Sequence, residues 1–229
     1  MEFTKLSNRL DLVASFVPAG ARLLDVGSDH AYLPIALLQE GKIEAAIAGE
    51  VVEGPYQSAL QNVADNGLED KIEVRLANGL AAFEPTDGIS CITIAGMGGR
   101  LIADILAAGL EKLANVSRLV LQPNNREDEL RAWLVDHDFH IVDEAILEEN
   151  EKFYEILVVE QGSQELTAKE LRFGPYLMRE QAPAFVQKWS KEVEKLAFAL
   201  EQVPVENQSA RASLEDRIAQ IKEVLNASK

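Results

Sequence analysis

The chain of 229 residues contains one cysteine, three histidines and only 6% aromatic residues. The single cysteine, Cys91, excludes an internal disulfide framework, as is typical of proteins in a reducing cytosol. Three scattered histidines and one cysteine do not supply the ligands of a structural zinc site. No apolar run reaches the roughly 18 residues that cross a bilayer, and residues 1–9 lack the apolar stretch of a secretory signal. We therefore expect a cytoplasmic protein without a membrane span or a metal ion.

Basic residues are also scarce, and they are unevenly placed. Lysine and arginine number 22 against 38 aspartates and glutamates, which gives a net charge of −16. Residues 1–160 hold 12 basic and 28 acidic residues, whereas residues 161–229 hold ten of each. Because a strongly acidic surface repels nucleic acid, any such partner is expected to contact the C-terminal part. The difference indicates two regions with different tasks.

Short apolar runs alternate with helical patterns over residues 20–160. The runs lie at 22–26, 45–49, 72–75, 89–95 and 118–121, and the helical patterns at about 33–40, 54–66, 99–113 and 126–136. Runs that are apolar throughout are typical of strands covered on both faces. The alternation predicts an α/β fold with a mostly parallel sheet. Two further strand-like runs, 140–148 and 153–160, predict an antiparallel hairpin at its end.

A second domain, of residues 162–229, is predicted after a first domain of residues 1–161. Thr167 and Glu170 have the spacing of a capping box that opens a helix. Two apolar stripes follow on either side of Pro204: Phe185, Trp189, Val193, Leu196, Leu200 and Val203, then Leu214, Ile218, Ile221 and Leu225. Stripes with spacings of three and four predict an antiparallel, coiled-coil-like helical hairpin.

The first predicted strand ends in a turn that contains Asp25, Gly27, Ser28 and Asp29. A strand, a glycine-bearing turn and a helix together form the topology that cradles a nucleotide-like ligand, although a plain loop is the alternative. Asp29 stands where a dinucleotide fold has its second glycine, and a carboxylate there repels a pyrophosphate. It can instead accept a hydrogen bond from an ammonium group or neutralise a sulfonium. The turn therefore favours S-adenosylmethionine over NAD or FAD.

The second and third predicted strands also end in polar residues. Glu50 lies 25 positions after Asp25, near the spacing at which an acidic residue binds ribose hydroxyls. Asn78 and Gly79 follow the third strand, where an amide and an open backbone can contact an adenine edge. The alternatives are a solvent-facing glutamate and an ordinary Asn-Gly turn.

The loops after the fourth and fifth strands are rich in glycine and amides. The fourth strand ends in Ala95-Gly96-Met97-Gly98-Gly99-Arg100, and the fifth ends in Gln122-Pro123-Asn124. Open α/β sheets bind ligands at these carboxyl ends. Three glycines within four positions predict a flat surface that a planar ring can approach, with a flexible loop as the alternative. The amides can bind a base or merely cap the next helix.

Four strings carry a closer resemblance: Leu6-Ser7-Asn8-Arg9-Leu10, residues 25–34, Ile94-Ala95-Gly96-Met97-Gly98-Gly99, and Leu121-Gln122-Pro123-Asn124. In this combination, over about residues 3–160, the chain resembles the bacterial tRNA (adenine(22)-N1)-methyltransferase family. That family has the Rossmann-like sheet of class I S-adenosylmethionine-dependent methyltransferases. The resemblance implies methylation of adenine N1 in the D-arm region of tRNA, with the helical extension helping to hold the tRNA.

The positions of these residues, together with the resemblance, indicate individual roles. The expected cofactor contacts are Asp25, Gly27, Ser28, Glu50, Asn78, Gly79, Ala95 and Gly96. The expected catalytic residues are Asp29, which stabilises the cationic product, His30 as a proton acceptor, and Tyr32 in the base pocket. The expected substrate contacts are Arg9, Met97, Gly98, Gly99, Arg100, Gln122, Pro123, Asn124, Lys188 and Lys191. Further basic candidates are Lys5 and Arg126 near the pocket, and Lys169, Arg172, Arg179 and Lys195 in the tail. For the basic residues of the tail, a solvated helix face is the alternative.

Other functions remain open at this point. A methyltransferase acting on a small metabolite would need no basic surface, and its helical extension could dimerise the chain. A cofactor-binding module without catalysis would use the extension to recruit a partner. A nicotinamide-dependent dehydrogenase is disfavoured by Asp29 in the first turn. The oligomeric state is open as well, with a monomer favoured.

Overall fold

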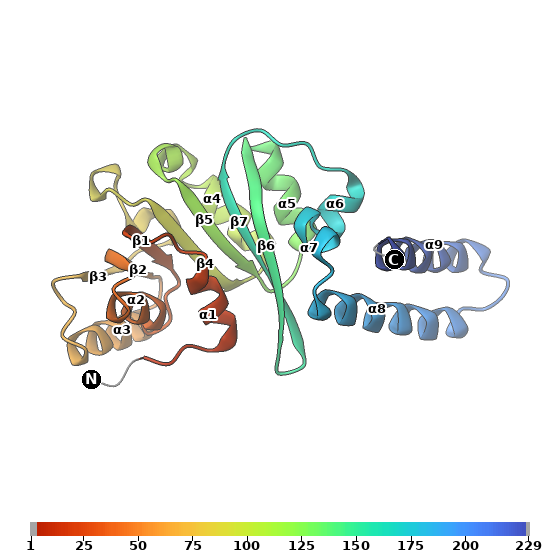
Figure 1. The fold of residues 1–229 in the computed structure, drawn as a ribbon, viewed down its shortest axis with the longest axis horizontal. Coiled ribbons are helices and arrows are strands. Elements are labelled where there is room, and N and C mark those ends of the chain that lie inside the picture. The colour runs from red at the N-terminus through yellow and green to blue at the C-terminus, as the bar shows by residue number, and fades with distance from the viewer. Residues whose placement is uncertain (1–3, 228–229) are drawn as a thin grey trace.

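The computed structural model describes residues 4–227, and a seven-stranded sheet forms its centre (Figure 1). The strands are β1 (Ala21–Val26), β2 (Ile43–Glu50), β3 (Ile72–Leu76), β4 (Cys91–Met97), β5 (Arg118–Pro123), β6 (Phe139–Glu149) and β7 (Lys152–Gln161). Their order is β3-β2-β1-β4-β5-β7-β6, with β1 to β5 parallel and β7 antiparallel to both neighbours. The predicted α/β sheet with an antiparallel terminal hairpin is confirmed.

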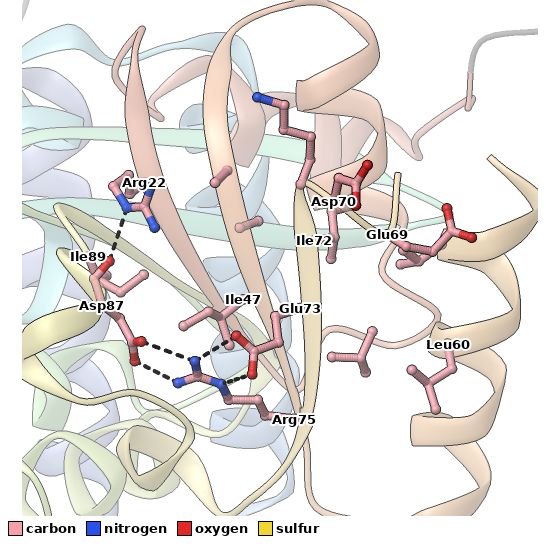
Figure 2. Close-up of a pocket in the computed structure, with 15 residues that line it drawn as sticks. Arg22, Ile47, Leu60, Glu69, Asp70, Ile72, Glu73, Arg75, Asp87 and Ile89 are labelled. Atoms are coloured by element: carbon pink, nitrogen blue, oxygen red, sulfur yellow. Dashed lines mark hydrogen bonds and ion pairs between the residues drawn. The ribbon is translucent and has the colours of Figure 1, made fainter. Parts of the chain in front are cut away.

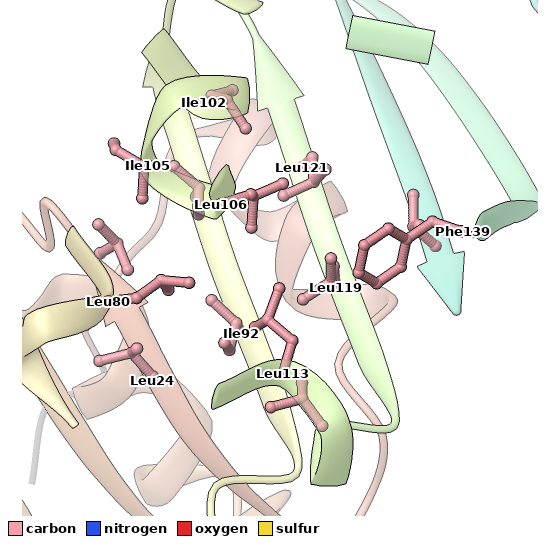
Figure 3. Packing of buried hydrophobic residues seen from close by; sticks show 14 of the residues in the cluster. Leu24, Leu80, Ile92, Ile102, Ile105, Leu106, Leu113, Leu119, Leu121 and Phe139 are labelled. Atoms are coloured by element: carbon pink, nitrogen blue, oxygen red, sulfur yellow. The ribbon is translucent and has the colours of Figure 1, made fainter. Parts of the chain in front are cut away.

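Helices cover both faces of this sheet. They are α1 (Asn8–Ser15), α2 (Tyr32–Gln39), α3 (Glu53–Asp65), α4 (Gly99–Ala107) and α5 (Glu127–Asp136), with 3₁₀ turns η1 (Gly79–Ala82), η2 (Pro85–Asp87) and η3 (Leu110–Asn115). One apolar cluster lies between the sheet and α4 and α5, and includes Ile92, Leu106 and Leu121 (Figure 3). A second lies between the opposite face and α1 to α3. Burial on both faces explains why the strands are apolar throughout.

Two local features differ from the prediction. The helix expected over residues 99–113 ends at Ala107, and η3 replaces its last part. At Gly109 a Cβ atom would stand 2.7 Å from Cβ of Leu80, so the chain can pass there only without a side chain. Helix α1 is not predicted at all, although Ser7 at its N-cap accepts a hydrogen bond from the Leu10 amide at 3.2 Å.

We call residues 4–161 the body and residues 162–227 the tail. The tail contains α6 (Ala168–Phe173), α7 (Pro175–Glu180), α8 (Pro183–Gln202) and α9 (Gln208–Asn226). The predicted capping box of Thr167 and Glu170 is present at the start of α6. Helices α8 and α9 form the predicted hairpin, which projects beyond β6 in Figure 1. None of the helices within residues 4–227 is long and apolar enough to cross a membrane.

The tail packs on the β6–β7 hairpin through a small apolar cluster. Its buried members are Ile146 of β6 and seven tail residues: Phe173, Leu177, Phe185, Trp189, Leu196, Ile221 and Val224. Leu200 and Val203, at the far end of the first predicted stripe, stay only half-buried. The predicted domain boundary after residue 161 coincides with the end of β7. The outermost residues of both predicted domains, 1–3 and 228–229, lie outside the described part.

Candidate functional site

The turn after β1 is fixed by a buried carboxylate. One oxygen of Asp25 accepts a hydrogen bond from Oγ of Ser28 and the other accepts one from Oγ1 of Thr93, both at 2.6 Å. Burial raises the pKa of Asp25 against the effect of these hydroxyl donors. Asp25 and Ser28 are thus bound to each other by their side chains. What they present to a ligand is a rigid turn.

The backbone of this turn is strained. After Gly27, at a φ of +66°, the residues Asp29, His30 and Ala31 have φ values of +41°, +68° and +58°. A left-handed conformation costs a residue with a side chain about 1 kcal/mol or more, and such strain clusters at functional sites. The Asp29 amide donates to Oε1 of Glu50 at 2.5 Å. Glu50, only 5% exposed, therefore connects the end of β2 to the strained turn.

Burial raises the pKa of Glu50, which opposes the effect of the Asp29 amide. Its backbone carbonyl accepts a hydrogen bond from the Ala77 amide at 2.7 Å, just before Asn78. Gly79 has a φ of +55°, and a Cβ atom there would stand 2.9 Å from Cγ2 of Ile105. The ends of β1, β2 and β3 therefore meet, as predicted. The positive φ and the packing against α4 both favour glycine at position 79.

The loops after β4 and β5 are joined through the fully buried side chain of Gln122. Its Oε1 accepts hydrogen bonds from Nη1 of Arg9 at 2.6 Å and from the Gly96 amide at 3.0 Å. Asn124 donates through its side chain to the Gly96 carbonyl and through its backbone amide to the Met97 carbonyl, both at 2.7 Å. The structure thus brings together most of the predicted substrate residues of the body, with Arg9 supplied by α1.

Two of the loop glycines have a role that differs from the predicted flat surface. A Cβ atom on Gly99 would stand 2.5 Å from the Arg126 carbonyl oxygen, and one on Gly98 would stand 3.1 Å from Oδ1 of Asn125. These positions let α4 begin against the loop that precedes α5. Gly96, at a φ of +80°, faces Arg9 instead. Arg100 is exposed and pairs with Glu129 at 2.9 Å.

The turn after β1 contacts the loop after β4. The end of the Met97 side chain lies against Gly27, in the space that a Cβ atom would need. A thioether side chain is flexible, so the space over Gly27 can be opened without moving the backbone. Gly27 and Met97 therefore form the junction of the predicted cofactor and substrate residues.

His30 and Tyr32 form a second group beside the same turn. Their rings stack with centroids 5.3 Å apart, and Nε2 of His30 lies 3.5 Å from the Asp29 carboxylate. Both rings line an open hollow of about 390 Å³, whose other walls come from α3. Asn62 of α3 donates to the His30 carbonyl at 2.8 Å. The three predicted catalytic residues are thus neighbours, with the Asp29 side chain 83% exposed.

A groove of about 760 Å³ runs between the body and the tail. On the body side Asn124, Asn125, Phe153 and Tyr154 line it, so the groove begins at the loop after β5. Six basic side chains line it, Lys152, Arg172, Lys188, Lys191, Lys195 and Arg217, against four acidic ones, Glu127, Asp128, Glu155 and Glu192. The groove is therefore positive on a protein whose net charge is −16.

The predicted basic contacts of the tail differ in their surroundings. Lys188 is bound to Glu155 at 2.6 Å and to Glu127 at 3.2 Å, so it does not lie on a solvated helix face and its charge is already paired with two carboxylates. The Lys191 ammonium lies 5.0 Å from the centre of the Phe153 ring. Lys169 pairs with Glu223 at 2.7 Å. Of Lys188 and Lys191, the latter is thus the better placed for a ligand in the groove.

The family model for tRNA (adenine(22)-N(1))-methyltransferases matches residues 23–223 of this sequence. The chain belongs to this family. It is 40% identical to the Bacillus subtilis tRNA (adenine(22)-N(1))-methyltransferase over 99% of both chains.

Solved structures of similar proteins share the whole fold, tail included. The Streptococcus pneumoniae protein Sp1610, solved in complex with S-adenosyl-L-methionine, is 67% identical, with a TM-score of 0.90 over 97% of this chain and 100% of that one. TrmK of M. capricolum, solved with S-adenosyl-homocysteine, is 29% identical, with a TM-score of 0.83 over 96% and 98% of the two chains. The tail is therefore part of the family's architecture.

Another hollow, of about 460 Å³, lies beside the edge strand β3 (Figure 2). Arg22 and Ile89, at or before the beginnings of β1 and β4, line it, so it lies away from the carboxyl ends of these strands. Arg75 is paired there with Asp87 at 2.6 Å and with Glu73 at 2.7 Å. Ligands of parallel sheets bind at carboxyl ends, so this hollow is not the family's methyl-transfer site.

Sequence reasoning missed two residues that shape the site. Thr93 binds the Asp25 carboxylate from within β4, and a hydroxyl in an otherwise apolar strand was a visible signal. Tyr154 of β7 lies with its ring centroid 5.6 Å from the Arg9 guanidinium carbon, and no local pattern indicates that contact. Both side chains contact residues that the sequence predicted for the site, Asp25 and Arg9.

Proposed function

We propose that this protein transfers the methyl group of S-adenosylmethionine to N1 of adenine 22 in tRNA. Membership of the family over residues 23–223 carries this proposal. The meeting of the strained turn, Glu50 and the Gly96 loop at one edge of the sheet supports it, because that edge is where a methyl-transfer site must lie.

The residues at this edge fit S-adenosylmethionine. Gly27 presents backbone without a side chain, and the buried Glu50 carboxylate stands where ribose hydroxyls are bound in related sheets. We assign the cofactor to Gly27, Ser28, Glu50, Asn78, Gly79, Ala95 and Gly96, with Asp25 holding the turn. Bound there, the cofactor supplies an electrophilic methyl group. The end of the Met97 side chain fills the space over Gly27, and we propose that it moves when the cofactor binds.

The chain's own contribution to the reaction is positioning and electrostatics. Adenine N1 carries an in-plane lone pair, so it can attack a methyl group without first losing a proton. The product ring is cationic, and the exposed Asp29 carboxylate is the group we assign to its stabilisation. The His30–Tyr32 pair offers an aromatic surface for a base turned out of its stack. We assign His30 as the acceptor of a proton from the methylated product.

We assign tRNA binding to the groove between the body and the tail. It starts at Asn124, next to the methyl-transfer site, and ends among the basic side chains of α8 and α9. Lysine and arginine neutralise phosphates, and Phe153, Tyr154 and Trp189 add aromatic surface. Every residue assigned here to the cofactor or to tRNA belongs to one chain, so the proposal needs no second copy. We propose that the protein acts as a monomer in the cytoplasm, together with its tRNA substrate.

The test is methylation of a defined tRNA. Unmodified transcript and S-adenosylmethionine are incubated with the protein, and the methylated nucleoside is mapped by mass spectrometry. We expect 1-methyladenosine at position 22 and none in a transcript carrying guanosine there. Asp29→Ala should lower kcat, whereas Asp11→Ala, a matched exposed aspartate on α1, should not. Methylation at another nucleotide, or of metabolites only, would contradict the proposal.

A further inference from the structure

The largest fully buried side chain of the body is a charged one. Arg131 of α5 is 0% exposed and binds two buried carboxylates, Glu144 of β6 at 2.8 Å and Glu155 of β7 at 2.5 Å. A buried ion pair is weak evidence for stability, because desolvation offsets most of the attraction. The methyl-transfer site does not use these residues. Their positions in the fold indicate another task.

Both carboxylates also bind the tail. Oε2 of Glu144 accepts a hydrogen bond from the Tyr176 amide at 2.9 Å, and Oε1 of Glu155 accepts one from Nζ of Lys188 at 2.6 Å. Arg131 itself donates to the Leu171 carbonyl at 3.2 Å. The charged residues of the body therefore bind α6, the start of α7, and α8.

Gly174 shows how closely the tail backbone approaches this cluster. It has a φ of +82°, and a Cβ atom there would stand 2.7 Å from Oε2 of Glu144 and 2.8 Å from Nη2 of Arg131. Any side chain at this position would displace either the Glu144 and Arg131 side chains or the tail backbone, and so disturb the contact between α6, α7 and the ion cluster. Lys188 binds Glu155 from α8, the helix that carries one wall of the groove.

We propose that Arg131, Glu144, Glu155 and Lys188 form a strut that fixes the tail relative to the body and so positions tRNA for methyl transfer. Directional, charge-assisted hydrogen bonds set an angle between two elements more sharply than a small apolar cluster does. Lys188 is then a positioning residue rather than an RNA contact. The inference rests on the proposed function, because it assigns the groove to tRNA.

The test uses Lys188→Met in the full chain, with two measurements. Spin labels on cysteines introduced at the exposed positions Glu40 of the body and Glu206 of the tail report the distance between the two regions. The native Cys91 does not interfere, because it is fully buried and burial raises the pKa of its thiol to about 12. Steady-state kinetics with tRNA give KM and kcat separately.

We expect Lys188→Met to broaden the label distance distribution and to raise KM for tRNA about ten-fold, as for a tethered binding surface that loses its alignment. The affinity for S-adenosylmethionine should stay unchanged. Lys188→Arg, which can bind both glutamates, should restore KM and the narrow distribution. Gly174→Ala should broaden the distribution as well, although it leaves every charge in place.

Lys112→Met is the matched control. Lys112 is 18% exposed in its side chain, against 22% for Lys188, and it binds the Phe83 carbonyl at 2.7 Å entirely within the body. The Lys112→Met variant should be less stable than the native protein, and its KM for tRNA should be unchanged. A wild-type KM or a wild-type distance distribution in Lys188→Met would overturn the strut. If the native protein methylates no tRNA, the proposed function fails instead, while the distance measurement still tests the strut.

Discussion

The body and the tail are held in place by different kinds of interaction. In the body, two apolar clusters fill the layers on either side of the sheet, and the site is built from backbone turns at its carboxyl edge. In the tail, one small cluster is supplemented by the ion pairs of Arg131, Glu155 and Lys188. The site of the body therefore depends on the absence of a side chain at positions such as Gly27, whereas the tail depends on charge.

The largest effect on catalysis is expected for Gly27→Ala, which tests the role of backbone shape in the body. An alanine at this position would be strained by the left-handed φ, and its Cβ atom would also collide with the end of the Met97 side chain. We expect kcat/KM to fall about 100-fold through misplacement of the reacting groups, measured by methyl transfer to tRNA.

Gly41→Ala is the matched control for that change. Gly41 has a φ of +68°, close to that of Gly27, but nothing lies within 4 Å of the position that a Cβ atom would take. It should lose about 1 kcal/mol of stability and keep its activity. Equal activity losses in the two variants would remove the role given to Gly27.

The largest effect on stability is expected for Arg131→Met, which tests the charged attachment of the tail. Removing the arginine leaves Glu144 and Glu155 buried beside one another. We expect the free energy of unfolding to fall by about 3–5 kcal/mol in denaturant titrations. Arg118→Met breaks a half-exposed pair with Glu160 and should cost about 0–1 kcal/mol. Similar losses in the free energy of unfolding for the two variants would mean that burial of the ion cluster does not make its disruption more costly.

A smaller effect is expected for Lys195→Glu, which tests the charge of the groove without touching the strut. Lys195 lines the groove and is 79% exposed in its side chain. We expect weaker binding to every tRNA, whatever its sequence, measured by filter binding at several salt concentrations. The slope of log K against log salt concentration should become smaller by about 1. Lys222→Glu, an exposed lysine of α9 outside the groove lining, should change the slope less. The reverse order would place the RNA elsewhere.

The smallest effect concerns pH and returns to the body. Burial raises the pKa of Asp25 above 3.8, so between pH 3.8 and its folded pKa the folded state binds more protons at this group than the unfolded state does. Stability from this group is complete below pH 3.8 and declines as pH rises through the folded pKa. Asp25→Asn cannot ionise, so its unfolding free energy should decline less over that range than that of the native protein. Parallel stability curves would contradict the raised pKa.

Much of the architecture was predictable because it depends on local patterns. Apolar runs indicated the strands of the sheet, the Thr167–Glu170 spacing indicated the start of α6, and stripes spaced by three and four indicated the α8–α9 hairpin. Helix α1 was missed because one capping serine and a short amphipathic stretch are a weak signal. The break after Ala107 was missed because the apolar pattern continues to residue 113, and the close approach of Gly109 to Leu80 joins residues far apart in the sequence.

The sequence by itself determined which residues stand at the ends of the strands, and parallel strands then gather those ends at one edge. Only the tertiary structure decided what each residue contacts there. It placed Met97 over Gly27, turned Gly98 and Gly99 toward the next loop, and bound Lys188 to Glu155. Such contacts join residues tens of positions apart. They depend on differences of a few tenths of an ångström in the distances between packed atoms, which no local sequence pattern encodes.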